Sequence, residues 1–261
     1  MFKFCSLFSG SSGNSSLVQT DTTKILVDVG ESAKKITDSL KKLNIDPNDI
    51  DAIIITHEHS DHTKGLSVFS NKYDIPVYAN IETWNALDSQ REKLEESNIK
   101  YFDFNKFKIG DLSILPFSIP HDAANPCGFN IYKGRKKISI ATDIGHMTAE
   151  VLDNLSKSSF VLLESNYDPN ILKCSSYPYP LKMRIYGPNG HLSNDDAGKT
   201  ISTLAKQGLN TVMLGHLSKE NNFPELAYKT VIEKLIEDNT DTDISLTIAN
   251  RNDLSQIIDI V

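Results

Sequence analysis

The chain has 261 residues, of which 39% are hydrophobic, with a formal net charge of −7 and an isoelectric point near 5.5. This content is enough for a sizeable core, and we predict one domain spanning residues 1–261. The acidic balance excludes a broadly basic nucleic-acid-binding surface, although bound cations can reverse the field at one site. No apolar run has the length of a membrane span or a signal peptide, so we expect a cytoplasmic protein without a membrane partner.

The first predicted strand begins at Phe2 and gives way to a loop of small residues, 9–16, before a second strand at Leu17. The loop has two interpretations, and the sequence does not favour one over the other. Its Gly and Asn residues tolerate positive φ, which is typical of a hairpin turn. Closely spaced backbone amides and hydroxyls can also bind a phosphate, here through Ser9, Ser11, Ser12, Asn14 and Ser15. The lysine and the spacing of a P-loop are missing, so we expect no nucleotide cofactor.

A βα unit precedes the part of the chain with the strongest chemical signal. Residues 24–30 form a predicted strand, and the spacing of Ile36, Leu40 and Leu43 predicts a helix over residues 33–43. The turn residues at 46–49, which include a proline, end this helix. The unit leads into a β-branched run at residues 53–56, a further predicted strand.

Three histidines and an aspartate follow that strand in the segment His57-Glu58-His59-Ser60-Asp61-His62. A chain that leaves a strand in extended form points residues two apart to the same side, so His57 and His59 can bind one cation. If a helix begins next, Asp61 and His62 face away from that pair and can bind a second ion. An isolated histidine is more often a surface or core residue, but this clustering favours a two-metal site.

The middle of the chain, from Leu66 to Glu164, is predicted to consist of helices and strands, some of which are followed by polar residues that can carry chemistry. A short helix through Leu66 and Phe69, a strand at 75–78 and an amphipathic helix at 82–96 come first. Strands are predicted at residues 102–109, 112–119, 127–132, 137–141 and 160–163. The polar residues that follow strand ends and can carry chemistry are His121, Asp143, His146 and Glu164, with Asp122 as the alternative to His121.

Residues 177–188 are locally basic and aromatic in an otherwise acidic chain. One interpretation is a rigid proline-rich loop, because the segment contains three prolines. The other is a contact with a nucleic-acid strand, in which Lys182 and Arg184 pair with phosphates and three tyrosines stack on bases or sugars.

The tetrapeptide Gly-His-Leu-Ser occurs twice, at residues 190–193 and 215–218. His191 follows a Gly/Pro-rich loop and precedes a predicted helix through Leu204. His216, in contrast, ends a strand predicted at residues 210–214. A helix at 227–236 and strands at 244–248 and 257–261 complete the chain without evident chemistry.

His57-x-His59-x-Asp61-His62 resembles the signature of the metallo-β-lactamase superfamily, whose fold is a four-layered αββα sandwich. The resemblance implies two divalent metal ions, of zinc, manganese or iron, since the same ligands accept each of them. It assigns His57, His59, His121 and Asp143 to one ion, and Asp61, His62, Asp143 and His216 to the other. A water between two ions about 3.5–4 Å apart ionises near neutral pH and becomes a nucleophile, which Asp61 can also orient.

A general acid separates the chemistries within this superfamily. Lactamases and thioesterases need only the metal ligands, whereas a phosphodiesterase gains from an acid that protonates the departing oxygen. His191, in a His-x-Ser motif that opens a helix, is similar to that acid in the nuclease members, and Glu164 is the candidate that orients it. A small-molecule hydrolase such as a thioesterase or lactonase is the alternative, followed by a metal-binding module without catalysis, which the complete ligand set disfavours.

Four motifs together resemble the YycJ/WalJ branch of the superfamily, and this resemblance covers nearly the whole chain. They lie at residues 9–15, 120–124, 190–194 and 215–218. The resemblance implies a bacterial, cytosolic enzyme that degrades double-stranded DNA from the 5′ end. The chain has no room for the extra cap domain of the larger β-CASP nucleases, so the resemblance does not extend to their kind of RNA processing.

Overall fold

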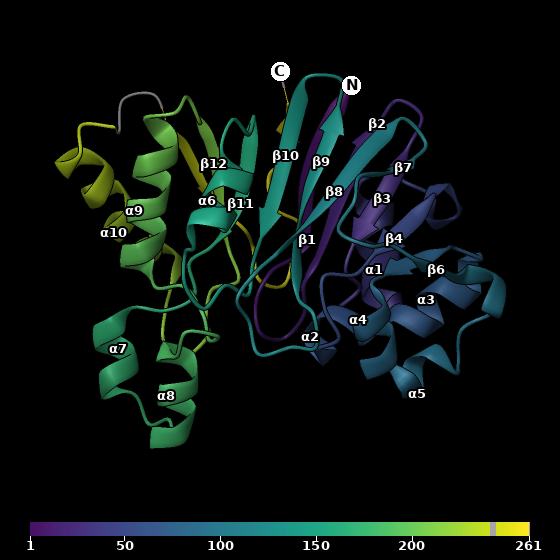
Figure 1. Cartoon of the computed structure of the whole chain (residues 1–261), viewed down its shortest axis with the longest axis horizontal. Helices are drawn as coiled ribbons and strands as arrows, with labels where there is room; N and C mark the ends of the chain where they lie inside the picture. The colour runs from purple at the N-terminus through teal and green to yellow at the C-terminus, as the bar shows by residue number, and fades with distance from the viewer. Residues whose placement is uncertain (241–243, 261) are drawn as a thin grey trace.

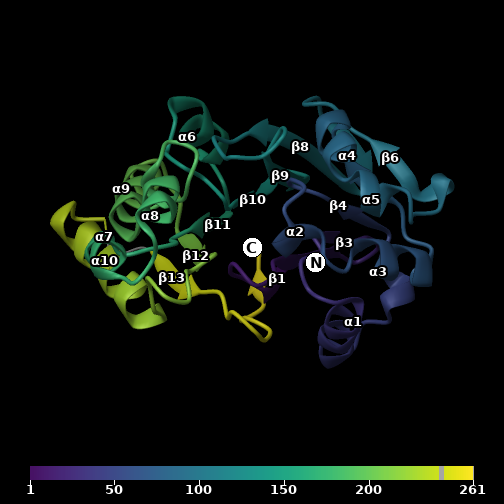
Figure 2. The same cartoon turned by 90° about the horizontal axis from the view of Figure 1, so that it is seen from below.

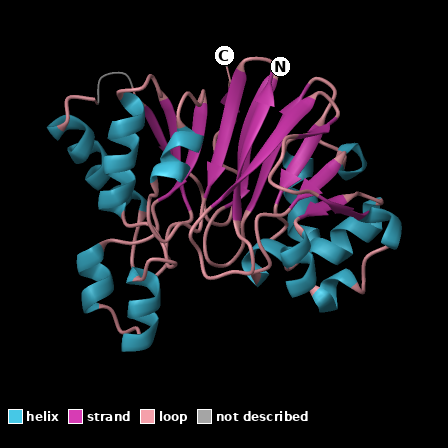
Figure 3. Ribbon diagram, in the orientation of Figure 1, coloured by secondary structure: helices cyan, strands magenta, loops and turns pink. Residues whose placement is uncertain are grey.

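The computed structural model describes residues 1–240 and 244–260, which form two seven-stranded sheets with helices on their outer faces (Figures 1 and 3). The strands of the first sheet are β1 (Phe2–Phe8), β2 (Ser15–Thr20), β3 (Lys24–Val27), β4 (Ala52–Ile54), β5 (Val77–Ala79), β6 (Ile99–Tyr101) and β14 (Ile258–Asp259). Those of the second are β7 (Phe107–Ile109), β8 (Leu112–Ser118), β9 (Cys127–Lys133), β10 (Lys136–Ala141), β11 (Phe160–Glu164), β12 (Thr211–Gly215) and β13 (Ser245–Ile248). The strand orders are β14-β1-β2-β3-β4-β5-β6 and β13-β12-β11-β10-β9-β8-β7.

The helices lie in two groups, one on each sheet. They are α1 (Ala33–Lys42), α2 (Ser60–Thr63), α3 (Leu66–Tyr73), α4 (Ile81–Ala86), α5 (Asp88–Arg91), α6 (Ala149–Leu155), α7 (Pro169–Cys174), α8 (Tyr179–Tyr186), α9 (Asn194–Ala205) and α10 (Pro224–Glu237), with 3-10 turns at Pro47–Asp49 and Glu96–Asn98. In Figure 1, α1, α3, α4 and α5 are grouped beside the first sheet, whereas α6, α9 and α10 lie beside the second. The predicted αββα sandwich is therefore confirmed, while one domain over residues 1–261 stays a prediction.

The core between the sheets consists of side chains that alternate along the strands. Phe4 of β1 and Phe160 of β11 are fully buried with their ring centroids 4.7 Å apart, so this pair joins the two sheets directly. Burial of a phenylalanine side chain contributes about 1.5–3 kcal/mol. A second cluster, which includes Ile36, Phe69 and Trp84, lies under the helices of the first sheet. A third, which includes Ile201 and Val231, lies under those of the second.

Strand direction brings the polar strand ends to one edge. Strands β3 to β6 run parallel to one another, as do β10 to β13. Strand β8 points the same way as β10, because both are antiparallel to β9. The carboxyl ends of parallel strands meet at the same edge of a sheet, which is where open α/β folds place their sites.

Two predicted elements are interrupted, and side-chain hydrogen bonds explain both interruptions. The predicted helix at 82–96 is divided into α4, α5 and a 3-10 turn. Near its end, Asn71 donates to the carbonyl of Lys93 and accepts from the amide of Glu95, in place of helical partners. The predicted strand at 102–109 is present only in part, as β7, since its first residues form the connection from the first sheet to the second. In that connection, Asp103 accepts the backbone N–H of Asn105, which forms a turn.

The segment 177–188 is mostly helical rather than a proline-rich loop. Pro180 lies in the first turn of α8, where a missing N–H costs no hydrogen bond, and α8 ends before Gly187. Together with α7 it projects beyond the strand ends at the lower left of Figure 1. The predicted strand at 257–261 is reduced to β14, and Val261 lies outside the described residues.

Candidate metal centre

The chain turns sharply where the proposed ligands leave the sheets. Asp28, Asp143 and His216 have positive φ angles of 62°, 60° and 53°. They follow β3, β10 and β12 within two residues. A left-handed conformation in a residue other than glycine costs about 1–3 kcal/mol and persists only where the surroundings enforce it. The loops after these strands converge near α2 in the view from below (Figure 2).

Three histidines form the first cluster. His59 Nδ1 lies 3.1 Å from His57 Nε2 and 3.3 Å from His121 Nε2. The outer nitrogen of His121, Nδ1, lies 3.1 Å from the carbonyl oxygen of Gly190, so this nitrogen is the donor and Nε2 faces the cluster with its lone pair. Strand ends on both sheets therefore bring together three imidazoles that the sequence predicts to share one ion.

The second cluster surrounds a carboxylate. Asp143 Oδ2 lies 2.9 Å from His216 Nδ1 and 3.1 Å from His62 Nε2. Asp61 Oδ2 is 3.6 Å from His62 Nε2 and 3.8 Å from His216 Nε2. On the other side of His62, Asp28 Oδ2 lies 2.8 Å from Nδ1 and orients the ring.

Asp143 faces both clusters. While Oδ2 contacts His62 and His216, Oδ1 lies 3.8 Å from Nε2 of His121 in the first cluster. The side chain is 3% exposed, so neither oxygen has bulk water as an alternative partner. A carboxylate with one oxygen toward each cluster has the geometry of a ligand that bridges two ions.

The protonation states fit metal ligation. Burial and the neighbouring His62 hold the pKa of His57 well below its usual range, which leaves the neutral form that binds metals. Burial raises the pKa of Asp143, but His216 and His62 outweigh it and hold this pKa well below the usual range. Burial lowers the pKa of His62, whereas Asp143 and Asp28 raise it well above the usual range, so a cation there replaces a proton. The nitrogen and carboxylate donors are consistent with a dinuclear divalent metal site.

His191 and Glu164 form an ion pair next to the second cluster. His191 Nδ1 lies 2.8 Å from Glu164 Oε1, and Glu164 Oε2 accepts the backbone N–H groups of Ile144 and Leu192. Burial lowers the pKa of His191, but the carboxylate of Glu164 outweighs it and raises this pKa to about 9. The imidazole is 20% exposed while Glu164 is fully buried. The pair therefore presents a protonated group to the solvent side of the cluster.

The loop at residues 9–16, which we call the serine loop, has several buried side chains that contact the proposed metal centre. Ser9 Oγ accepts the backbone N–H of His216 at 2.8 Å, and Ser15 Oγ donates to the carbonyl of Asp28 at 2.8 Å. Asn14 Nδ2 lies 3.0 Å from His62 Nε2 and 3.3 Å from Asp61 Oδ2. These side chains are buried, whereas Ser11 and Ser12 are exposed. The turn interpretation accounts for the buried members, and only the two exposed serines are free to meet a substrate.

Lys182 and Arg184, both on α8, have different surroundings. Lys182 Nζ donates to the carbonyls of Lys173 and Ser175, and so fastens the end of α7 to α8. Arg184 forms a two-point ion pair with Asp122, whose Oδ1 lies 3.4 Å from His121 Nε2. Arg184 therefore lies close to the first cluster, and Asp122, the alternative to His121, is ion-paired with it.

Sequence reasoning missed a buried amide network beneath the centre. Asn222 Nδ2 donates to the carbonyls of Ser165 and Asn166 and to Asn194 Oδ1. Asn166 Nδ2 in turn donates to the carbonyl of His216 at 2.8 Å. Asn166, Asn194 and Asn222 come from three segments that are far apart in the sequence and meet only in the folded chain. No local signal could have found this network.

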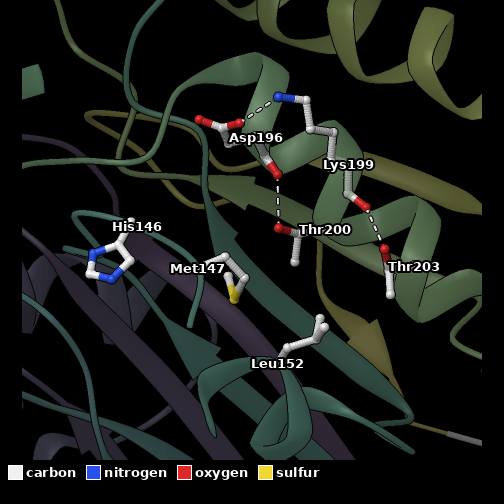
Figure 4. A pocket seen from close by; sticks show the side chains of 7 residues that line it. All are labelled: His146, Met147, Leu152, Asp196, Lys199, Thr200 and Thr203. Atoms are coloured by element: carbon white, nitrogen blue, oxygen red, sulfur yellow. Dashed lines mark hydrogen bonds and ion pairs between the residues drawn. The ribbon is translucent and has the colours of Figure 1, made fainter. Parts of the chain in front are cut away.

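His146, which has no assigned role, lines a separate cavity of about 350 Å³ (Figure 4). Its Nδ1 lies 2.7 Å from the carbonyl oxygen of Pro188 and acts as the donor. Figure 4 shows Lys199 beside Asp196 on α9, in the wall of the same cavity, and the two form an ion pair of 2.8 Å. His146 is therefore tied to the loop before His191 and does not join either metal cluster.

In the described residues, no helix combines the length and apolar character needed to cross a membrane.

Sequence comparisons connect this geometry to known proteins. The chain is 40% identical over 239 residues to the exodeoxyribonuclease WalJ of Streptococcus pneumoniae serotype 2, a match that covers 90% of this chain and 89% of that protein. It is 36% identical over 235 residues to the exodeoxyribonuclease YycJ of Bacillus anthracis, with the same coverage of 90% and 89%.

Solved structures show the same fold at lower identity. YhfI from Bacillus subtilis has a TM-score of 0.71 at 14% identity and covers 98% of this chain and 100% of its own. Zinc-bound PqqB from Methylobacterium extorquens has a TM-score of 0.72 at 16% identity, with 98% and 99% covered. The family model described as the Metallo-beta-lactamase superfamily matches residues 9–216. The chain belongs to the metallo-β-lactamase superfamily.

Proposed function

We propose that the protein is a metal-dependent exodeoxyribonuclease. The observation that carries this proposal is the His191–Glu164 ion pair beside the paired clusters, because it adds a proton donor to a set of metal ligands. Phosphodiester hydrolysis gains from that donor, which protonates the departing sugar oxygen, whereas lactone and thioester hydrolysis need only the metal ligands. The relatives at 36–40% identity are named exodeoxyribonucleases, which supports the same chemistry here.

In the proposed site, two clusters share Asp143. His57, His59 and His121 with Asp143 would hold one divalent ion, and Asp61, His62 and His216 with Asp143 would hold the other. Bound ions would supply a hydroxide nucleophile and neutralise charge on the phosphate. Asp61, whose side chain is 22% exposed, orients the attacking water, and His191 donates the proton to the leaving oxygen. Glu164 keeps His191 protonated and fixes its ring.

The substrate is double-stranded DNA degraded from the 5′ end in the cytoplasm. The named activity of the two relatives supports DNA, and Arg184, which is ion-paired with Asp122, is the basic side chain of α8 that lies near the first cluster. Ser11 and Ser12 of the serine loop contribute exposed donors near the same centre. Zinc, manganese and iron are all compatible with these ligands.

Linear and closed-circular duplexes of the same sequence, labelled at the 5′ or the 3′ end, test the proposal directly. We expect linear DNA to be degraded with early release of the 5′ label and closed circles to survive. Metal content of protein purified without chelator identifies the ion. Equal cleavage of circles would indicate an endonuclease. Hydrolysis of thioesters in preference to bis-p-nitrophenyl phosphate would favour the small-molecule hydrolase instead.

A further inference from the structure

A cavity of about 290 Å³ lies directly beside the segment that carries His216. We call it the Arg251 pocket, and it is lined by Ser9, Lys219, Asn222, Phe223, Asn250 and Arg251, among others. Ser9 accepts the backbone N–H of His216, and Asn222 donates to the carbonyl of Asn166, whose side chain in turn donates to the carbonyl of His216. The pocket and the proposed metal centre therefore share walls.

Two basic side chains line this pocket, and no acidic side chain does. Arg251 Nη2 donates to the carbonyl of Leu217, and among the described residues no carboxylate lies within 4 Å of its guanidinium. Lys219 is 79% exposed and lies 3.9 Å from Glu220, an exposed pair that water screens. Glu220 is not among the residues that line the pocket, although its charge also acts on Arg251, so the positive charge is offset from outside the pocket rather than by a carboxylate in its wall.

Other cavities with basic residues differ in this respect. The cavity at Lys199 contains Asp196, which forms an ion pair with it (Figure 4). The cavity that contains Arg135 and Lys137 is also lined by Asp153. An arginine half-buried without a carboxylate is costly unless an anion joins it, so the Arg251 pocket is suited to an anion in a way that these cavities are not.

Arg251 is also packed against the serine loop. The backbone N–H of Ser9 points to the carbonyl of Arg251 at 3.4 Å, and a Cβ on Gly10 would lie 2.6 Å from Arg251 Nη1. Gly10 has no Cβ and so leaves room for the guanidinium beside the loop that also carries the exposed Ser11 and Ser12. The basic partner of the serine loop is therefore Arg251 rather than Lys182, which is fastened to α7.

We propose that the Arg251 pocket binds one phosphate group of the DNA substrate, an inference that rests on the proposed exonuclease function. The planar guanidinium offers paired donors that match phosphate oxygens. Phe223, 48% exposed at the pocket wall, offers an apolar surface to the adjoining sugar or base. A strand held here has a second anchor beside the His216 segment, separate from Arg184 on α8.

Equilibrium binding tests this proposal on the metal-loaded full chain. The probe is a fluorescent duplex with phosphorothioate linkages at its ends, which resist hydrolysis, and anisotropy is measured over a series of salt concentrations. We expect Arg251→Gln to lower the slope of log K against log salt by about one and Arg251→Lys to retain most of it. The matched control is Arg135→Gln, which removes the same charge at the β9–β10 turn and is expected to keep the wild-type slope.

Two outcomes would overturn the proposal. One is a wild-type slope in Arg251→Gln, and the other is an equal decrease in Arg135→Gln, which would indicate only a change in net charge. If Arg251→Gln unfolds, Lys219→Gln is used in its place, because the Lys219 side chain is exposed and its replacement should not affect folding. We expect Lys219→Gln to lower the salt slope by less than one. A 5′-phosphorylated and a 5′-hydroxyl duplex are compared in parallel. If Arg251→Gln lowers the salt slope only for the 5′-phosphorylated duplex, the pocket binds the terminal phosphate. If it lowers the slope for both duplexes, the pocket binds an internal phosphate.

The same data separate this proposal from the proposed function. If the wild-type protein neither binds nor degrades DNA, both fail. If it degrades linear DNA while Arg251→Gln keeps the wild-type slope, only the pocket proposal is wrong.

Discussion

The hydroxyl of Ser9 accepts the backbone N–H of His216 at 2.8 Å, across 207 positions of the chain. Ser9 is 4% exposed and His216 is 1% exposed, so this bond is shielded from bulk water. His216 also has a positive φ angle, which its surroundings must enforce. A loop that looks like a simple turn therefore determines the backbone position of a proposed metal ligand.

Ser9→Ala should destabilise the protein, because it leaves the buried N–H of His216 without a partner. We expect a decrease of about 1–3 kcal/mol in the free energy of unfolding, measured by denaturant titration. Ser11→Ala is the matched control, since Ser11 is exposed, and its unfolding free energy should be unchanged. Equal stability of the two variants would mean that Ser9 does not support His216.

His191→Ala should keep its metal content and lose about a hundredfold or more in rate, the usual contribution of general acid catalysis. The loss should be largest on DNA and smaller on p-nitrophenyl phosphodiesters, whose leaving group needs no proton. Glu164→Gln removes the ionic partner of His191 and should show the same dependence on the leaving group. Metal loss in His191→Ala but not in His216→Ala would reverse the two roles.

Asp143→Asn should lose at least one ion and nearly all hydrolysis, because an amide cannot offer an anionic oxygen to each cluster. Metal per chain, measured by elemental analysis, is the direct readout. Asp122→Asn serves as the control, since Asp122 pairs with Arg184, and it should retain both ions. Two ions and normal turnover in Asp143→Asn would contradict the bridging assignment.

Chelation should lower the unfolding midpoint temperature, because the clusters bring buried imidazoles and carboxylates together. An ion that binds only the folded state stabilises it by about 2.7 kcal/mol at a free concentration of one hundred times Kd. Thermal unfolding with and without chelator measures this effect, and Asp143→Asn should respond less than the wild type. A chelator that removes the ions without changing the midpoint would show that the clusters form independently of metal.

How much the sequence predicts depends on how far apart the interacting residues lie. His57, His59, Asp61 and His62 are recognisable because four donors occur within six residues after a strand, and the sandwich follows from the same motif. Asn222 and Arg251 could not be found this way, since their hydrogen-bond partners lie in other segments, 28 and 56 positions away for Asn222 and 34 positions away for Arg251.

The wrong predictions also have physical causes. Residues 177–188 contain three prolines, which suggest a loop, but Pro180 falls in the first turn of α8, where proline is compatible with a helix. The helix at 82–96 is interrupted where Asn71, from α3, replaces its backbone partners. Both outcomes depend on register or on tertiary contacts, which periodicity does not contain.

The division of the proposed ligands between the two sheets has a consequence for synthesis. His57, His59 and His62 leave the ribosome with the first sheet, whereas Asp143 and His216 follow only with the second. A nascent chain therefore contains three of the proposed imidazole ligands before Asp143 is made. The complete set of proposed ligands exists only once synthesis has passed His216.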